Sequence, residues 1–161
     1  MYRSITDARR QADYVVVIIH GGLEMYQLPT LRMKETYRFF VDAGADAVVN
    51  HHQHCFSGYE VYKGKPIFYG LGNFCFDWEG RRNSIWNQGY AITLTFSEKV
   101  EHEIHPYVQC DECPAVCLQD NGHYKTSIKK LNEIIADDRK LEERFSKYAL
   151  EKRFSIDHIS I

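Results

Sequence analysis

The stretch Tyr14-Val-Val-Val-Ile-Ile-His-Gly-Gly22 decides the fold of this chain of 161 residues. Its apolar run is continuous rather than alternating, which predicts a strand covered on both faces, as in the centre of an α/β sheet. A helix predicted over Leu31–Asp42, with Gly44 placed to end it, leads to a second apolar strand, Ala45–Val49. The order is therefore strand, helix, strand, and each strand is followed by histidine.

The rest of the chain predicts antiparallel strands and then helix, without a linker that would divide it. We therefore predict one α/β domain with a mixed sheet over residues 1–161, of which residues 122–161 form a mainly helical C-terminal segment. The individual elements expected are a hairpin of Tyr59–Tyr62 and Ile67–Tyr69, a long ordered loop over 70–88, strands at Tyr90–Phe96 and Val100–Val108, and one or two helices over Thr126–Lys152.

Composition narrows the class of protein. Hydrophobic residues make up 44% of the chain, enough for a packed core, and the net charge of -2 offers no electrostatic surface for nucleic acid. No apolar run approaches the roughly 20 residues that span a bilayer, and the polar first ten residues do not read as a signal peptide. The five cysteines, an odd number, favour a reducing, cytoplasmic compartment, while the cell envelope stays open for a longer protein.

Histidines follow both predicted strands of the strand–helix–strand unit. His20 ends the first strand, and the pair His52 and His54 lies just beyond the second. Ligands in open α/β sheets gather at this carboxyl edge, and imidazole nitrogens bind divalent transition metals. The sequence therefore predicts that these three side chains converge on a metal ion, the alternative being solvated histidines in surface loops.

Three stretches, in this order, resemble successive signatures of the CapA/PgsA family of bacterial capsule synthesis proteins. They are His20-Gly-Gly-Leu-Glu24, Gly44-Ala-Asp-Ala-Val-Val-Asn-His-His-Gln-His54 and Tyr69-Gly-Leu-Gly-Asn-Phe-Cys-Phe-Asp77. The resemblance covers roughly residues 7–110. It implies a calcineurin-like metallophosphatase fold, with this chain as the C-terminal half of a four-layer α/β sandwich, and a part in poly-γ-glutamate capsule synthesis.

The resemblance also implies roles for individual residues. His20, His52 and His54 match the family's metal-binding histidines, which would hold a divalent ion such as manganese, iron or zinc. His51 and Asn73 match positions that line the same cleft, and Glu24 follows His20 closely enough to approach the site. The implied activity is that of a metal-dependent hydrolase acting on a phosphate ester or an anionic polymer.

One departure from the family pattern bears on activity. No Asp-x-His, Gly-Asp or Asn-His-Asp/Glu signature precedes His20, so the chain carries about half of a two-metal site. We therefore expect it to bind one metal weakly or none, to be weak or inactive alone, and to associate with a missing N-terminal half or as a homodimer. The alternative is a non-catalytic binding or scaffold protein in capsule polymer synthesis or export.

Two further clusters leave alternatives open. Cys110, Cys113 and Cys117 have a spacing that zinc sites use, with His105 or His123 as a fourth ligand, but an ordinary loop is the preferred interpretation. Arg81 and Arg82, beside Trp78 and Trp86, are suited to an acidic polymer because guanidinium groups match carboxylates, whereas a solvated loop tip is the plainer interpretation.

Overall fold

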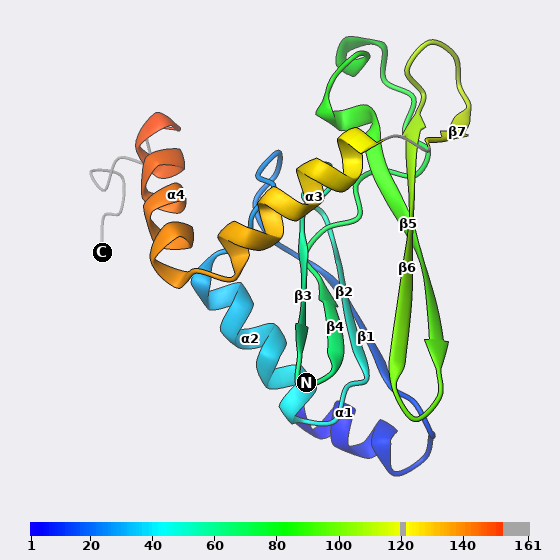
Figure 1. The fold of residues 1–161 in the computed structure, drawn as a ribbon, viewed down its shortest axis with the longest axis vertical. Helices are drawn as coiled ribbons and strands as arrows, with labels where there is room; N and C mark the ends of the chain where they lie inside the picture. The colour runs from blue at the N-terminus through cyan, green and yellow to red at the C-terminus, as the bar shows by residue number, and fades with distance from the viewer. Residues whose placement is uncertain (120–121, 153–161) are drawn as a thin grey trace.

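The computed structural model of the chain describes residues 1–119 and 122–152. Two sheets lie face to face, one of four strands in the order β1-β2-β4-β3 and one of three strands in the order β5-β6-β7 (Figure 1). The elements are α1 (Tyr2–Arg9), β1 (Val16–His20), α2 (Leu31–Asp42), β2 (Ala47–His51), β3 (Tyr59–Tyr62), β4 (Lys65–Phe68), η1 (Glu79–Arg81), η2 (Ile85–Asn87), β5 (Gln88–Phe96), β6 (Val100–Gln109), β7 (Val116–Leu118), α3 (Gly122–Ile135) and α4 (Asp138–Glu151).

The four-stranded sheet is mixed, as the sequence predicts. β1 pairs with β2 and β2 with β4 in parallel, while β3 runs antiparallel to β4. The crossover helix α2 begins at Thr30, whose side chain accepts a hydrogen bond from the Met33 N–H, and it ends before Gly44, which has a positive φ of 119°. The register pairs His20 with His51, so the two strands end level with each other.

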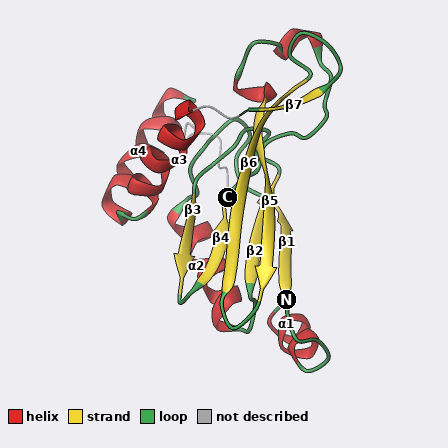
Figure 2. Ribbon diagram, turned by 45° about the vertical axis from the view of Figure 1, so that its right-hand side comes forward, coloured by secondary structure: helices red, strands yellow, loops and turns green. Residues whose placement is uncertain are grey.

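β2 lies at the centre of the core, and both of its faces are covered. On one side α2 contributes Tyr37 and Phe40, and on the other Val49 packs against Phe68 and Tyr90. The second sheet lies across the first, α3 lies beside β3, and α4 packs against α3 and α2 (Figure 2). The continuous apolarity of β2 therefore has the predicted cause, since a strand buried on both faces has no polar side to alternate with.

The prediction of a central strand covered on both faces is wrong for β1, because β1 is the edge strand of its sheet. Ile18 is 72% exposed and Val16 is exposed as well. The second sheet reaches β1 only near its start, where the rings of Tyr14 and Phe96 lie 4.8 Å apart. Among the described residues, this face of β1 is therefore only partly covered, although its sequence is as apolar as that of β2.

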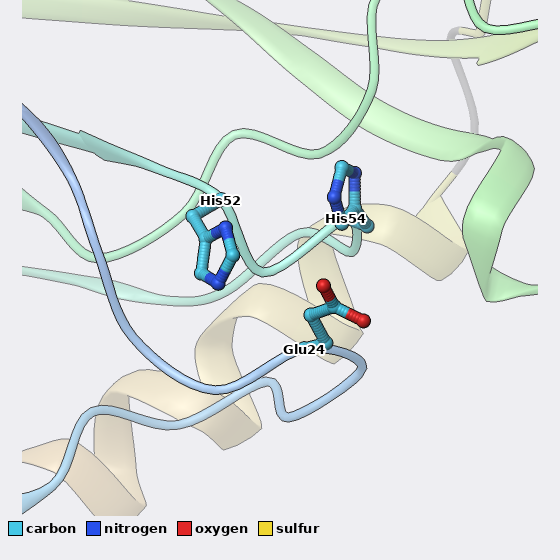
Figure 3. Close-up of side chains that lie close together, drawn as sticks. All are labelled: Glu24, His52 and His54. Carbon is cyan, nitrogen blue, oxygen red and sulfur yellow. The ribbon is translucent and has the colours of Figure 1, made fainter.

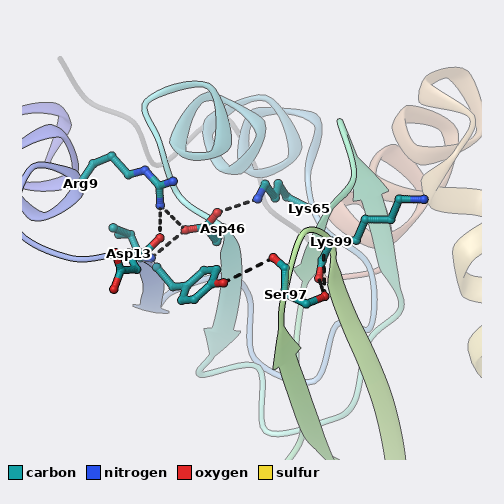
Figure 4. Close-up of polar contacts among 8 residues, drawn as sticks. Arg9, Asp13, Asp46, Lys65, Ser97 and Lys99 are labelled. Carbon is teal, nitrogen blue, oxygen red and sulfur yellow. Dashed lines mark hydrogen bonds and ion pairs between the residues drawn. The ribbon is translucent and has the colours of Figure 1, made fainter.

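The end of the sheet away from the histidines is tied together by Asp46 (Figure 4). Its buried carboxylate accepts hydrogen bonds from Arg9 at 2.7 Å, Lys65 at 2.6 Å and the Val15 N–H at 2.8 Å. Burial opposes the ionised form, but the Lys65 and Val15 hydrogen bonds and the charges of Lys65 and Arg9 outweigh it, so the pKa of Asp46 lies below its ordinary value.

The C-terminal segment forms two helices, where the sequence allowed one or two. Asp137 caps α4 by accepting a hydrogen bond from the Lys140 N–H. Lys34 of α2 is 3% exposed, and its ammonium group donates to the Ile135 carbonyl and to the Asp138 carboxylate, which joins α2 to the α3–α4 corner. Residues 153–161 of the predicted segment lie outside the described residues. No described helix combines the length and the apolar character required to cross a membrane.

Candidate metal site

The candidate site begins where β1 and β2 end side by side. The Gly21 N–H donates to the His51 carbonyl at 3.0 Å, which continues the strand pairing by one bond. The chain then turns sharply, and His52 and His54 have positive φ angles of 104° and 56°. Such angles are uncommon for residues other than glycine and are found preferentially at functional sites. The turn brings both side chains to the edge where His20 lies.

His52 lies next to both of the other predicted ligands. Its Nδ1 is 3.2 Å from Nε2 of His20, and its ring centroid is 5.8 Å from that of His54. Glu24 approaches the same point from the loop after β1 (Figure 3). One ligand atom each from Glu24, His52 and His54 lies within 4.8 Å of the other two. The structure therefore places His20 beside His52, and it places His52 beside Glu24 and His54.

These donors fit a divalent transition metal. Ligand atoms on a metal with bonds of about 2.1 Å lie no more than about 4.2 Å apart, so small side-chain rotations would close the set around one ion. Two imidazoles and a carboxylate are a common donor set for zinc, manganese or iron. The carboxylate of Glu24 also supplies the only negative charge in the group. The residues present therefore suit one divalent cation.

The loop after β1 reaches the site through a backbone contact. The Met25 N–H donates to the Gln53 carbonyl at 2.7 Å, and Met25 adopts a positive φ of 57°. This bond attaches the Glu24 loop to the middle of the His52–His54 turn. The sequence placed Glu24 near the site only because it follows His20 closely. In the structure, the Met25–Gln53 hydrogen bond holds the Glu24 loop against the His52–His54 turn.

Asn73 orients His54 and does so with a fixed amide. Its Nδ2 donates to the carbonyls of His54 at 3.3 Å and Trp86 at 3.1 Å, so its Oδ1 must face Nδ1 of His54, 2.8 Å away. Because Oδ1 can only accept, Nδ1 carries the hydrogen and Nε2 keeps the lone pair that a metal requires. Asn73 thus contacts a candidate ligand rather than the candidate metal position itself.

His51, which the resemblance placed in the cleft, is half-buried at the end of β2. Burial first, and electrostatic repulsion with His20 second, lower the pKa of His51 below its ordinary value. It is not part of the Glu24–His52–His54 group. Its position is adjacent to the metal-binding candidates, and its role stays a prediction.

Asn50 supports the site and was not singled out from the sequence. It is fully buried, and its Nδ2 lies within hydrogen-bonding distance of the carbonyls of Gly21 (2.8 Å) and Tyr69 (2.9 Å) and of Oε1 of Gln53 (3.1 Å). The Tyr37 hydroxyl donates to its Oδ1 at 2.9 Å. Asn50 therefore holds the ends of three chain segments together. The available signal was an amide at the end of an otherwise apolar strand.

The loop between β4 and β5 forms an aromatic wall beside His54. The ring of Trp86 is stacked on His54 with centroids 4.8 Å apart, and the half-exposed Phe76 and Trp78 meet Trp86 edge-on. The guanidinium group of Arg81 lies 5.3 Å from the Trp78 ring and 5.5 Å from the Trp86 ring. The sequence reading missed the contact of Trp86 with His54, because the two are far apart in the chain.

The two arginines of the loop differ in their contacts. The charge of Arg82 is paired with Asp77 at 2.8 Å, and it also donates to the Glu112 carbonyl. Arg81 is exposed over the two indole rings. Of the predicted pair for an acidic polymer, Arg81 is therefore the one whose charge faces solvent beside the site.

The cysteine stretch forms an ordered turn and a short strand, β7, where a loop was expected. Cys110 is buried, whereas Cys113 and Cys117 are exposed. His105 contacts Thr93, and the side chain of His123 lies outside the described residues. Across the described part of the chain, Glu24, His52 and His54 form the one group with metal-ligand spacing. The zinc alternative for the cysteines therefore has no support in that part.

Comparison with known proteins agrees with the family resemblance. Residues 1–78 match the family described as "Bacterial capsule synthesis protein PGA_cap". The chain is 37% identical over 131 residues to the "PGA biosynthesis protein CapA" of Bacillus subtilis (strain 168), which covers 80% of this chain and 34% of that protein. It is 48% identical over 66 residues to the "Capsule biosynthesis protein CapA" of Bacillus anthracis, covering 41% of this chain and 16% of that one.

A more distant similarity exists to a "Probable polyglutamine synthesis accessory protein" of Mycobacterium tuberculosis (strain ATCC 25618 / H37Rv), with 36% identity over 73 residues, which are 45% of this chain and 19% of that one. The chain thus spans about a third or less of the length of these relatives. The resemblance to the CapA/PgsA family is confirmed.

Proposed function

We propose that this chain, whose residues 1–78 belong to the PGA_cap family of bacterial capsule synthesis proteins, is the histidine-bearing part of a metal-dependent hydrolase in capsule polymer synthesis. The observation that carries the proposal is the convergence of Glu24, His52 and His54 within 4.8 Å, with His20 in contact with His52. A divalent ion held there would supply Lewis acidity toward a phosphoryl or amide oxygen of the substrate and acidify a water molecule.

The protein's own residues would prepare this site in three ways. Asn73 fixes the tautomer of His54, Asn50 holds the strand ends in register, and the aromatic wall of Phe76, Trp78 and Trp86 shields one side of the site from water. A drier site strengthens every electrostatic interaction with a charged substrate. Arg81, on the same wall, would attract an anionic substrate such as a phosphate ester or a polycarboxylate.

We also propose that the two sheets are the C-terminal half of a four-layer metallophosphatase-like sandwich. β1 and β5 are outermost strands of their sheets, so both sheets can be extended at these edges. The uncovered apolar side chain of Ile18 on β1 supports this arrangement. A homodimer or a preceding segment of the same protein would provide the additional strands.

Metal binding is the first test of the proposal. We expect the wild-type chain to bind Mn²⁺, Fe²⁺ or Zn²⁺ in calorimetry, and the variants His52→Ala and Glu24→Gln to lose at least about tenfold in affinity. His105→Ala is the matched control and should bind like wild type, because His105 is a partly exposed histidine on β6 that contacts Thr93 and is not part of the Glu24–His52–His54 group. Equal affinity in all four proteins would remove the basis of the proposal.

The second candidate function is a non-catalytic binding or scaffold role for the capsule polymer. The exposed Arg81 over Trp78 favours it, because guanidinium and aromatic surfaces can bind a polycarboxylate without any metal. Phosphoesterase turnover that depends on His52 supports the hydrolase. Polyglutamate binding that survives His52→Ala and is lost in Arg81→Ala, with no turnover, supports the scaffold.

A further inference from the structure

Two cysteines that the proposed function does not use face each other behind the aromatic wall. The sulfur atoms of Cys75 and Cys110 are 3.9 Å apart, although 35 positions separate them in the chain. Cys110 is fully buried at the end of β6, and Cys75 is exposed in the loop before η1. A disulfide requires a sulfur–sulfur bond of about 2.05 Å, so the two thiols would have to approach each other by about 2 Å.

Hydrogen bonds on both sides of the pair hold the two segments in place. Oε1 of Gln109 accepts from the Phe76 N–H at 2.7 Å, and Nε2 of Gln109 donates to the Trp86 carbonyl at 3.2 Å. The Asn87 amide donates to the Cys110 carbonyl at 3.0 Å. Because the backbone next to each cysteine is bonded to the other segment, the thiols stay near each other without a covalent link.

We propose that Cys75 and Cys110 form a reversible disulfide that locks the loop of residues 73–87 onto the end of β6. The bond would form by thiol–disulfide exchange with a small-molecule disulfide. Sulfur chemistry of this kind needs one accessible thiol and one neighbouring thiol that completes the exchange, and the exposed Cys75 and the buried Cys110 meet these two requirements.

The exchange with oxidised glutathione balances as follows. The Cys75 thiolate attacks one sulfur of glutathione disulfide, which forms a mixed disulfide and releases one glutathione thiolate. The Cys110 thiol then loses its proton and its sulfur attacks Sγ of Cys75, which breaks the mixed disulfide and releases the second glutathione. Two protein thiols are oxidised, one glutathione disulfide is reduced, and the two thiol protons end on the two glutathiones. Burial raises the pKa of the Cys110 thiol, which is consistent with Cys75 reacting first.

The lock would act on the candidate site through two of its neighbours. Asn73, two positions before Cys75, orients His54, and Trp86, bonded to Gln109 beside Cys110, is stacked on His54. Fixing the loop reduces the freedom of both contacts. This consequence, unlike the disulfide itself, rests on the proposed metal-binding function.

The test maps the disulfide in the intact chain. A Cys113→Ser/Cys117→Ser variant leaves Cys110 as the one cysteine in tryptic peptide 100–125, while Cys75 lies alone in peptide 64–81. After incubation with oxidised glutathione, we expect the two peptides to be linked in non-reducing mass spectrometry and released by dithiothreitol. Wild type should melt on the order of 5 °C higher when oxidised than when reduced, a difference that Cys75→Ser abolishes.

Other outcomes would overturn the proposal. A stable glutathione adduct on Cys75 with a free Cys110 thiol would show that the buried partner does not complete the exchange. In wild type, a bond of Cys110 to Cys113 or Cys117 in place of Cys75 would show that the turn, and not the loop, supplies its partner. Cys75→Ser replaces an exposed thiol, so the folded control remains available if Cys110→Ser is unstable.

Metal affinity is measured separately on the oxidised and reduced chains. Tighter binding by the oxidised form, by severalfold, would support the coupling to His54. A mapped Cys75–Cys110 disulfide together with no metal binding in either form would contradict the proposed function and leave the disulfide established. Metal binding by a chain in which no Cys75–Cys110 disulfide forms would contradict the proposed disulfide and leave the proposed function standing.

Discussion

Nδ1 of His54 donates its hydrogen to the side-chain oxygen of Asn73 over 2.8 Å, and two backbone carbonyls determine which way that amide points. The imidazole is therefore held in one tautomer and one orientation before any ligand arrives. Replacing a residue that hydrogen-bonds a metal ligand in this way commonly lowers metal affinity by about 10- to 100-fold.

Replacing Asn73 with alanine should weaken metal binding by about 10- to 100-fold while leaving the fold largely intact. The variant leaves His54 free to rotate and to exchange tautomers. Asn83→Gly, in the same loop at an exposed position with a positive φ of 55°, is the control, because glycine adopts that angle without strain. Calorimetric titration with Zn²⁺ or Mn²⁺ measures both. An Asn73→Ala protein that binds as tightly as wild type would show that the contact does not prepare His54.

The chain as it stands should hold at most one divalent ion. Among the described residues, Glu24 is the one carboxylate grouped with His52 and His54 at metal-ligand spacing. A second cation would therefore lie close to the first without a second carboxylate to bridge them. Two such cations repel strongly in a site partly shielded from water. Elemental analysis after dialysis against the metal should give no more than one equivalent per chain. Two retained equivalents, lost in His52→Ala, would show that the site is binuclear.

Gly72→Ala should destabilise the fold by about 2–4 kcal/mol. Gly72 has a φ of 86°, and a Cβ built there would lie 2.5 Å from the Gln88 carbonyl oxygen and 2.9 Å from Cα of Gly89. Gly64→Ala separates backbone strain from steric crowding, because Gly64 has a similar φ of 77° but open space around it. This variant should therefore cost only about 1 kcal/mol. Urea unfolding measures both. Equal losses would assign the whole effect to the backbone angle.

Asp46→Asn should lower the free energy of unfolding by about 2 kcal/mol at pH 7, because the buried carboxylate accepts from Arg9, Lys65 and the Val15 N–H. The folded pKa of Asp46 lies below the ordinary value of 3.8. Its contribution is therefore complete above that value and declines as pH falls from 3.8 through the folded pKa. The gap between wild type and variant, measured by urea unfolding, should narrow over that range.

Asp42→Asn is the control for this experiment, since Asp42 pairs with Lys63 on the exposed side of the same region. We expect no resolvable change in stability, because exposed ion pairs contribute little. A loss in Asp42→Asn as large as that in Asp46→Asn would mean that burial of the Asp46 carboxylate does not set the size of the effect.

The strand–helix–strand unit and the position of its histidines were determined by the sequence alone. The apolar run at residues 14–19, the helix over Leu31–Asp42 and the second run before Asn50 are local patterns, and such patterns report on the neighbours along one strand or one helix. The placement of His20 and His51 at the same edge then follows from parallel pairing. The hairpin of β3 and β4 was likewise read from its turn.

Only the tertiary structure decided which surfaces are covered and which side chains meet across the chain. The apolar runs of β1 and β2 are nearly alike, yet β2 is enclosed and Ile18 of β1 is exposed, because the second sheet reaches β1 only near its start. The stacking of Trp86 on His54 and the approach of Cys75 to Cys110 join segments that no periodicity relates. Such contacts depend on how sheets and loops pack in space, and a linear pattern carries no record of that packing.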